Sequence, residues 1–288
     1  MSKYTTYFLA AISLLLLWIG SSGCSPIPND GVPIYLQVDS PTVVIDDVSF
    51  GTSSQRIVDV WAETGNHNLG GYEMPVKIPV LAQGDVPFII SAGILDNGLV
   101  DARVQYPFYR PDTFTIGTAI PGHVYVHHPV YHYFARTHIA LNENFEGGSS
   151  FTGLSRTNYS TDSAVYEGAH SGAILMGVND TTNFATQLSP VTITTNGRQA
   201  YVELNYKSDV YFDVGIRETT GTGTSATITD IPVITLSPRS YWNKTYLNLS
   251  TAIGSYQGAG FQLYFISYKL PGTTGKLYLD NIKLLYFN

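Results

Sequence analysis

Charged residues are scarce in this sequence, and their scarcity excludes a protein built mainly from helices. Only 13% of the 288 residues are Asp, Glu, Lys or Arg, about half the usual share in soluble proteins. Tyr, Thr, Ser, Gly and Asn take the place of helix-favouring Glu and Lys, which is typical of strands and turns. Because hydrophobic residues still reach 44%, the chain can bury a core and is not disordered by composition.

Basic residues are also few. The 15 Lys and Arg residues are outnumbered by 22 Asp and Glu residues, which gives a formal net charge of -7. A surface that binds nucleic acid needs an excess of positive charge to neutralise phosphates, so nucleic acid is excluded as a partner. Calcium, sugars and proteins remain compatible with this charge.

The sequence contains a single cysteine, Cys24, so an internal disulfide is excluded. An apolar run from Tyr7 to Ile19 follows the positively charged Lys3. Its thirteen residues are too few to span a hydrocarbon layer of about 30 Å. A run of this length is typical of the hydrophobic region of a signal peptide.

The small residues at positions 20–23, followed by Cys24, resemble the lipobox of bacterial lipoproteins, although Ser21 stands where Leu is typical. The resemblance implies a signal peptide over residues 1–23, lipidation of Cys24 (palmitate among its acyl chains) and a tether over residues 24–33. Several acyl chains would give lasting membrane anchoring. The alternatives are a plain signal peptide cleaved nearby and an uncleaved anchor.

Ser25 is a non-acidic residue directly after the cysteine. In the lipoproteins that this segment resembles, such a residue accompanies sorting to the outer membrane. We therefore expect a lipid-anchored outer-membrane protein, with its periplasmic or cell-surface orientation left open.

Residues 34–139 are expected to form a small immunoglobulin-like β-sandwich with a connector, because short strand patterns alternate with turn residues. Pro79 cannot donate to a ladder, so its segment is expected to be an edge strand or an irregular crossing. The aromatic segment from Tyr106 to Pro111 is interpreted as a loop that plugs one end of this sandwich. A platform for a ligand or partner is the alternative.

Five of the seven histidines lie between Gly122 and His138. A zinc site needs converging ligands, and His128 and His132 would share one face of a strand. No cysteine lies nearby, so we favour an aromatic-rich pair of strands that joins two domains. A histidine metal site stays open as the alternative.

Residues 140–288 are the right length for a β-jelly roll of about eight to ten strands. The segment 200–206 alternates, with Tyr201, Glu203 and Asn205 on one face, and the segment 210–216 alternates as well. The predicted fold class is therefore all-β, with an immunoglobulin-like sandwich followed by a jelly-roll sandwich.

Four motifs in this half occur in a recognisable order. They are Asn144–Glu146, Val165–Gly172, Tyr241–Ser250 and Tyr278–Lys283. The set resembles carbohydrate-binding modules of jelly-roll type and their galactose-binding-like and adhesion-domain relatives. The resemblance covers about half of the chain, and it indicates the fold better than the ligand.

In such modules, acidic residues of the first and last strands often meet at a structural calcium ion. The resemblance places Glu146 and Asp280 at these positions, and it suggests loop oxygens near Glu167 and Ser171 as further ligands. Calcium prefers six to eight oxygen ligands, which carboxylates and carbonyls supply. The alternative is that Glu146 and Asp280 accept hydrogen bonds from turn amides.

Aromatic side chains are the candidates for contact with a sugar, because their faces pack against sugar C–H groups. Tyr159 and Tyr256 are expected in loops, where they could form a platform. Trp242 is a further candidate, although its place at the start of a strand favours a structural role.

The sequence shows no nucleophile elbow and no phosphate-binding loop. We therefore expect a non-catalytic, membrane-anchored lipoprotein that binds glycan or another extracellular ligand through its jelly roll. The alternative is a structural or assembly subunit whose partners are cell-envelope proteins. A glycan-active hydrolase is the less favoured third interpretation, since paired carboxylates can come from distant strands.

Overall fold

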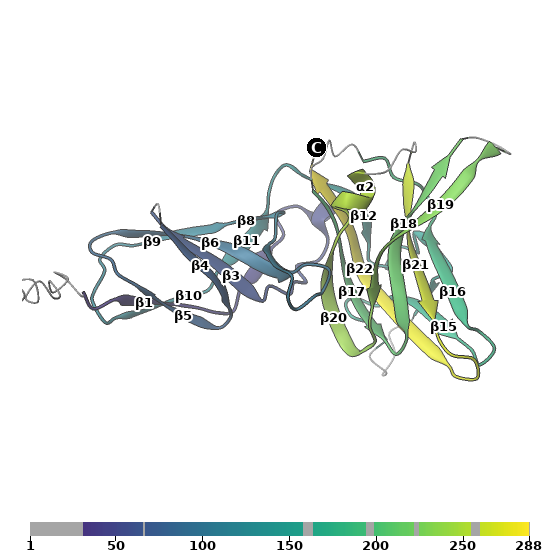
Figure 1. Ribbon diagram of the computed structural model, residues 1–288, viewed down its shortest axis with the longest axis horizontal. Helices are drawn as coiled ribbons and strands as arrows, with labels where there is room; N and C mark the ends of the chain where they lie inside the picture. Colours follow the sequence, from purple (N-terminus) through teal and green to yellow (C-terminus); the bar gives the residue numbers. More distant parts are fainter. Residues whose placement is uncertain are drawn as a thin grey trace, which may run out of the picture.

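The computed structural model describes residues 31–287, apart from residues 66, 158–163, 194–198, 222–224 and 255–259 (Figure 1). It confirms the all-β architecture, with a small immunoglobulin-like sandwich followed by a jelly roll. Within the described residues, no helix is both long enough and apolar enough to cross a membrane.

The first domain is a sandwich of short strands. The sheet β10-β1-β5 faces the sheet β4-β3-β6-β7, to which β9 adds beside β6, and a small sheet β2-β11-β8 lies at one end. Its elements are β1 (Ile34–Val38), β2 (Thr42–Val44), the 3-10 helix η1 (Val48–Phe50), β3 (Asp59–Thr64), β4 (His67–Glu73), β5 (Val76–Val80), β6 (Val86–Leu95), β7 (Arg103–Gln105), β8 (Tyr109–Arg110), β9 (Asp112–Ile116), β10 (Val124–His127) and β11 (Val130–Tyr133).

The core of this sandwich follows from the alternation of side chains along its strands, which turns apolar residues to one face. Leu36 on β1, Ile78 on β5 and Phe88 on β6 are buried in one cluster between the two larger sheets. Pro79 lies in β5, which pairs only with β1, so the predicted edge position is confirmed.

The second domain is a jelly roll of two antiparallel sheets. One has the order β14-β15-β22-β17-β20 with β12 beside β22, and the other has the order β13-β16-β21-β18-β19. The elements are β12 (Thr137–Glu143), β13 (Phe151–Thr152), β14 (Ser155–Arg156), β15 (Gly172–Met176), β16 (Thr182–Gln187), β17 (Ala200–Ser208), β18 (Tyr211–Thr220), β19 (Thr227–Leu236), β20 (Arg239–Asn248), α2 (Ser250–Gly254), β21 (Phe261–Tyr268) and β22 (Gly275–Phe287). Strand β12 crosses the expected domain boundary between residues 139 and 140.

The first sandwich packs against the outer face of β12, β22, β17 and β20. Tyr106, Phe108 and Tyr133 of the first domain share one buried cluster with Tyr201 and Tyr246 of the second. In Figure 1, β17, β20 and β22 lie towards the first domain, and β16, β18 and β21 lie on the far side. The arrangement therefore covers one face of the jelly roll and leaves the opposite face open.

Candidate functional site

Three of the residues singled out from the sequence lie outside the described residues. They are the lipidation candidate Cys24 and the loop candidates Tyr159 and Tyr256. Their assignments stay predictions.

The two calcium candidates, Glu146 and Asp280, both hold the turn at residues 166–171. Glu146 Oε1 accepts hydrogen bonds from the amides of Ala169 (2.8 Å) and His170 (2.9 Å). Asp280 Oδ2 accepts from the Ser171 hydroxyl at 2.6 Å and from the Glu167 amide at 3.3 Å. These bonds to amide and hydroxyl donors match the alternative role expected for both carboxylates.

The two calcium candidates differ in their surroundings, because only Glu146 borders a cavity. Asp280 is fully buried, and burial raises its pKa to about 6 although Ser171 and three backbone amides stabilise the charged form. Glu146 lines a cavity of about 330 Å³ opposite Glu167, and Asp280 is not among its lining residues. Within the described residues, no three acidic, histidine or cysteine side chains gather as a metal site. Calcium binding stays a prediction.

Trp242 lies on the outer face of β20, outside the buried core of the jelly roll. Its ring centroid is 5.5 Å from that of Tyr166 and 6.5 Å from that of Tyr278. Trp242 and Tyr278 are half-buried, whereas Tyr166 is exposed. The Tyr166 hydroxyl lies 3.0 Å from Ser54 Oγ of the first domain, so the group borders the region that this domain covers. The role of Trp242 in ligand binding stays a prediction.

The histidine-rich segment forms β10 and β11, whose histidines pair with aspartates. His127 Nε2 lies 2.8 Å from Asp112 Oδ2, and His132 Nδ1 lies 2.9 Å from Asp46 Oδ2. His128 pairs in turn with Asp39 at 2.7 Å. These three histidines therefore each pair with an aspartate of another segment, which is the pattern of local cross-links. His123 and His138 pack instead against the rings of Tyr125 and Tyr286.

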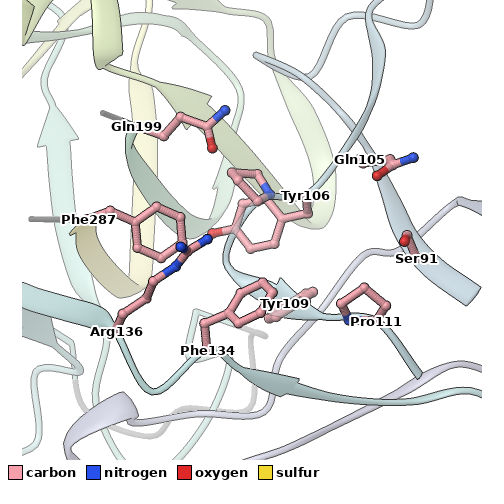
Figure 2. Close-up of a pocket in the computed structure, with 10 residues that line it drawn as sticks. Ser91, Gln105, Tyr106, Tyr109, Pro111, Phe134, Arg136, Gln199 and Phe287 are labelled. Atoms are coloured by element: carbon pink, nitrogen blue, oxygen red, sulfur yellow. The ribbon is translucent and has the colours of Figure 1, made fainter. Parts of the chain in front are cut away.

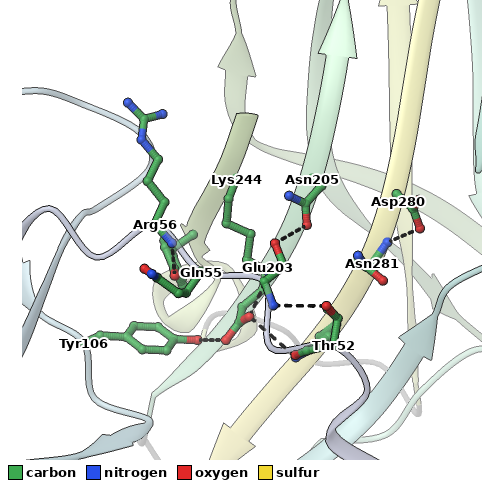
Figure 3. A network of polar contacts seen from close by, with 12 residues as sticks. Thr52, Gln55, Arg56, Tyr106, Glu203, Asn205, Lys244, Asp280 and Asn281 are labelled. Atoms are coloured by element: carbon green, nitrogen blue, oxygen red, sulfur yellow. Dashed lines mark hydrogen bonds and ion pairs between the residues drawn. The ribbon is translucent and has the colours of Figure 1, made fainter. Parts of the chain in front are cut away.

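A buried ionic cluster joins the two domains (Figure 3). Glu203 on β17 is fully buried, and its Oε1 accepts hydrogen bonds from the hydroxyls of Tyr106 (2.6 Å) and Tyr133 (2.8 Å). Its Oε2 lies 2.9 Å from Lys244 Nζ and 4.0 Å from Lys283 Nζ. Lys283 also donates to the carbonyl of Thr52 at 2.7 Å. The cluster therefore fixes the first domain on the second.

The pKa values in this cluster follow from burial and charge. Burial by itself would raise the pKa of Glu203, but the two ammonium groups outweigh it and hold the pKa below its usual value. Burial lowers the pKa of Lys283 to about 8, although Glu203 favours its charged form. Tyr106 stays neutral because burial and the carboxylate raise its pKa well above 10. Glu203 is thus a structural residue, because its side chain has no contact with solvent.

The outer face of β16, β21, β18 and β19 is turned away from the first domain (Figure 1). Tyr211 on β18 pairs with Tyr268 on β21, and Tyr268 pairs with Thr182 on β16. The next residue on β18, Phe212, is buried in the core, so alternation directs Tyr211 outwards. Tyr211 is 52% exposed, and Tyr268 is half-buried.

Further rows of side chains continue along this face. The second row contains Phe184, Ile266 and Asp213, and a later row pairs Arg217 with Asp230. We call the outward side chains of these rows the open face, defined by Phe184, Tyr211, Asp213, Arg217, Asp230, Tyr264 and Tyr268. Tyr264 is only 2% exposed, so it supports its neighbours and does not itself reach a ligand.

Gly215 leaves the space for Tyr264, the buried ring that supports Phe184 on the open face. A Cβ atom at Gly215 would lie 2.4 Å from both Cζ and the hydroxyl oxygen of Tyr264, so only glycine lets this ring lie across β18. Tyr264 stacks on Phe184 with ring centroids 5.6 Å apart. The Arg217 guanidinium lies 4.2 Å from the centroid of Phe184, within the range of cation–π attraction. Phe184 therefore has a packing partner in Tyr264 and a second contact in Arg217.

Polar groups lie between these rings. Arg217 donates to both oxygens of Asp230, at 2.7 and 2.8 Å, and these bonds raise the pKa of Arg217. Asp213 Oδ1 accepts from the hydroxyls of Tyr268 (3.0 Å) and Thr235 (2.6 Å). Fixed carboxylate and guanidinium edges beside ring faces can bind a ligand that carries both C–H faces and hydroxyl groups.

Sequence reasoning missed most of the open face. The alternation of residues 210–216 placed Tyr211 and Asp213 on one side, but it did not tell which side was open. Phe184, Arg217 and Tyr268 belong to no sequence motif. They lie beside Tyr211 and Asp213 only because strands that are distant in the sequence pair with each other.

No family model matches the sequence, and no curated protein matches it. Solved structures that are similar include a family 16 carbohydrate-binding module, at 16% identity and a TM-score of 0.34, over 51% of this chain and 99% of that one. A cleaved adhesin domain of Lys-gingipain from Porphyromonas gingivalis matches at 11% identity and a TM-score of 0.35, over 52% and 99%. A family 11 carbohydrate-binding module from Clostridium thermocellum, in complex with a mixed-linked tetrasaccharide, matches at 14% and 0.33, over 51% and 94%.

Proposed function

We propose that this protein is a non-catalytic, glycan-binding protein, and that the open face of its jelly roll holds the glycan. The observation that carries the proposal is the group of the Phe184, Tyr211 and Tyr268 rings beside Asp213 and the Arg217–Asp230 pair, on the sheet face that the first domain does not cover. Rings contact the C–H faces of a sugar, and planar polar groups bind its hydroxyls.

The arrangement of the two domains supports this choice of face. The opposite sheet has its outer face buried against the first domain around Glu203 and Tyr246, so a glycan cannot reach that part of it. A rigid first domain then serves as a spacer that holds the open face away from the N-terminal end of the chain.

A glycan array with the purified full chain tests the proposal. Tyr211→Ala removes a ring that is 52% exposed on the open face, and Tyr241→Ala removes a ring that is 56% exposed on β20, outside the open face. We expect about tenfold weaker glycan binding for Tyr211→Ala, or about 1.4 kcal/mol, and unchanged binding for Tyr241→Ala. Equal losses in both variants, or no glycan bound by the folded chain, would contradict the proposal.

We further propose that the chain is anchored to a bacterial outer membrane through a lipid on Cys24. The support is the leader-like segment and the small residues that precede the only cysteine. Cys24→Ser is expected to move the protein from the membrane fraction to the soluble fraction. Retention of that variant in the membrane would show that another segment anchors it.

A further inference from the structure

A cavity of about 660 Å³ lies where the two domains meet, on the covered side of the jelly roll (Figure 2). Its walls come from the first domain, the connector and the last strand. The lining includes the rings of Tyr106, Tyr109, Phe134 and Phe287 and the polar side chains of Gln105 and Arg136. Sites for small molecules have volumes of about 300–1,000 Å³ and occur preferentially at domain interfaces.

Arg136 is the one charged side chain among the described residues that line this cavity. Its guanidinium lies 4.6 Å from the ring centroid of Phe287 and 5.1 Å from that of Phe134. Arg136 is an exposed residue whose guanidinium lies over these two rings, and its N–H edge is left for a ligand. In the described part of the chain, no carboxylate pairs with Arg136, whereas Arg103 and Arg217 both have acidic partners.

The charge of this cavity is opposite in sign to the net charge of the whole chain. A protein with a net charge of -7 repels small anions in general, so a cavity whose single charge is positive is a local exception. An arginine of fixed orientation binds a carboxylate through two parallel hydrogen bonds. The neighbouring rings of Tyr106 and Phe287 offer apolar surface to a flat or ring-shaped body.

Polar side chains on the opposite side of the cavity indicate a second polar group on the ligand. In Figure 2, Ser91 and Gln105 lie across the cavity from Arg136 and Phe287. Their hydroxyl and amide groups can donate and accept hydrogen bonds to a polar substituent at the far end of a ligand. A ring with a carboxylate at one end and a polar group at the other fits these three parts of the lining.

We propose that this interdomain cavity binds a small ring-shaped carboxylate, with Arg136 as the residue that recognises the carboxylate. A uronic acid and an aromatic acid share this chemistry. The site is separate from the open face, so it stands or falls independently of the proposed glycan binding.

Titration calorimetry of the purified full chain tests this proposal with galacturonate, benzoate and galactose as probes. We expect at least one of the two acids to bind, and neutral galactose to bind at least tenfold more weakly than that acid, because a charge-assisted hydrogen bond is lost. Binding of galacturonate alone assigns the cavity to a sugar acid, and binding of benzoate alone assigns it to an aromatic acid.

The matched variants are Arg136→Gln and Arg110→Gln. Arg110 is an exposed arginine on β8 that does not line the cavity. Arg136→Gln is expected to weaken binding of the acid roughly tenfold or more, and Arg110→Gln is expected to leave it unchanged. If Arg136→Gln does not fold, Arg136→Lys tests the same point, because it keeps the charge but loses the two parallel hydrogen bonds.

Two results would overturn the proposal. One is the absence of saturable binding of either acid to the folded wild-type chain. The other is binding of an acid that persists unchanged in the Arg136 variants.

Discussion

At the scale of single residues, Glu203 is the carboxylate on which the domain interface depends. It has no exposed surface, and two lysines and two tyrosines of both domains surround it. A buried charge is tolerated when its partners satisfy it, and removal of one partner leaves the others uncompensated.

Glu203→Gln therefore tests the strength of the cluster. We expect a loss of about 3–5 kcal/mol in the free energy of unfolding, because the ammonium groups of Lys244 and Lys283 would stay buried without their carboxylate. Glu73 provides the control, since its side chain is 70% exposed and pairs with Arg103 at 3.1 Å. Glu73→Gln is expected to cost less than about 1 kcal/mol in the same urea titration. Similar losses in the two variants would contradict the structural role of Glu203.

The raised pKa of Asp280 predicts how the free energy of unfolding changes with pH. Burial raises its folded-state pKa to about 6, above the usual value of 3.8, so the folded chain binds more protons than the unfolded chain between these values. The contribution of Asp280 to stability therefore increases as the pH falls from about 6 to about 4. In EDTA, Asp280→Asn should remove this contribution from the pH dependence of urea unfolding.

Bound calcium would change the expected dependence of unfolding on pH. A cation bound to Asp280 would favour the charged carboxylate and would lower its pKa. Added calcium should then stabilise the wild-type chain more at pH 7 than at pH 5. A pH dependence that is the same with calcium, with EDTA and in Asp280→Asn would contradict both the titration and the calcium prediction.

At the scale of strands, the open face depends on the close approach of β18 and β21. Gly215 on β18 leaves the space that the Tyr264 ring occupies, and the carbonyl of Ile231 lies 2.5 Å from the position of its missing Cβ. Gly117, which follows β9, has no atom within 4 Å of the equivalent position. These two glycines differ in packing, and neither has a positive φ.

Gly215→Ala is expected to displace Tyr264 and to cost about 1–3 kcal/mol in the free energy of unfolding. Because Tyr264 supports Phe184, the variant should also lose glycan affinity. Gly117→Ala should change neither quantity in the same denaturation and binding assays. Full glycan affinity in a folded Gly215→Ala variant would show that the ring stack does not contribute to the site.

The strands and their faces were largely predictable from sequence, because alternation is a local signal. The pattern at 200–206 correctly placed Tyr201, Glu203 and Asn205 on one face. Alternation does not reveal what covers a face, and the cover of Glu203 comes from Tyr106 and Tyr133, which lie 97 and 70 residues away.

The candidate site was less predictable than the fold. Phe184, Arg217 and Tyr268 meet through strand register, which depends on turns and packing along the whole jelly roll. The segment at 106–111 was expected to plug one end of the first sandwich. Its aromatic rings do fill the end of that sandwich, but they also contact the second domain. The missing information was the relative placement of two domains, which no local pattern encodes.

At the scale of the whole molecule, the domain interface makes the two sandwiches depend on each other. Separation would expose Tyr201, Tyr246, Leu285 and Phe287, which are all nearly fully buried in the shared cluster. Each large apolar side chain loses about 1.5–3 kcal/mol when its burial is lost completely. Glu203 would also lose the hydroxyls of Tyr106 and Tyr133.

A fragment of residues 137–288, which keeps β12 intact, is therefore expected to self-associate and to unfold at lower urea than the full chain. Sedimentation and urea titration measure the two effects. Leu285→Ser and Phe287→Ser in the fragment should reduce self-association, because they remove part of the exposed apolar patch. A monomeric wild-type fragment with the urea midpoint of the full chain would show that the interface contributes little.

Hydroxyl-radical footprinting of the full chain, with and without a saturating glycan from the array, tests directly whether the open face holds the glycan. Binding at the open face predicts protection of Tyr211, Tyr268 and Phe184. Tyr166, Tyr241 and Trp242, on the other sheet and its flank, should be oxidised at the same rate in both samples. Protection of Trp242 and Tyr166 without any protection of Tyr211 and Tyr268 would instead place the glycan site on the opposite sheet.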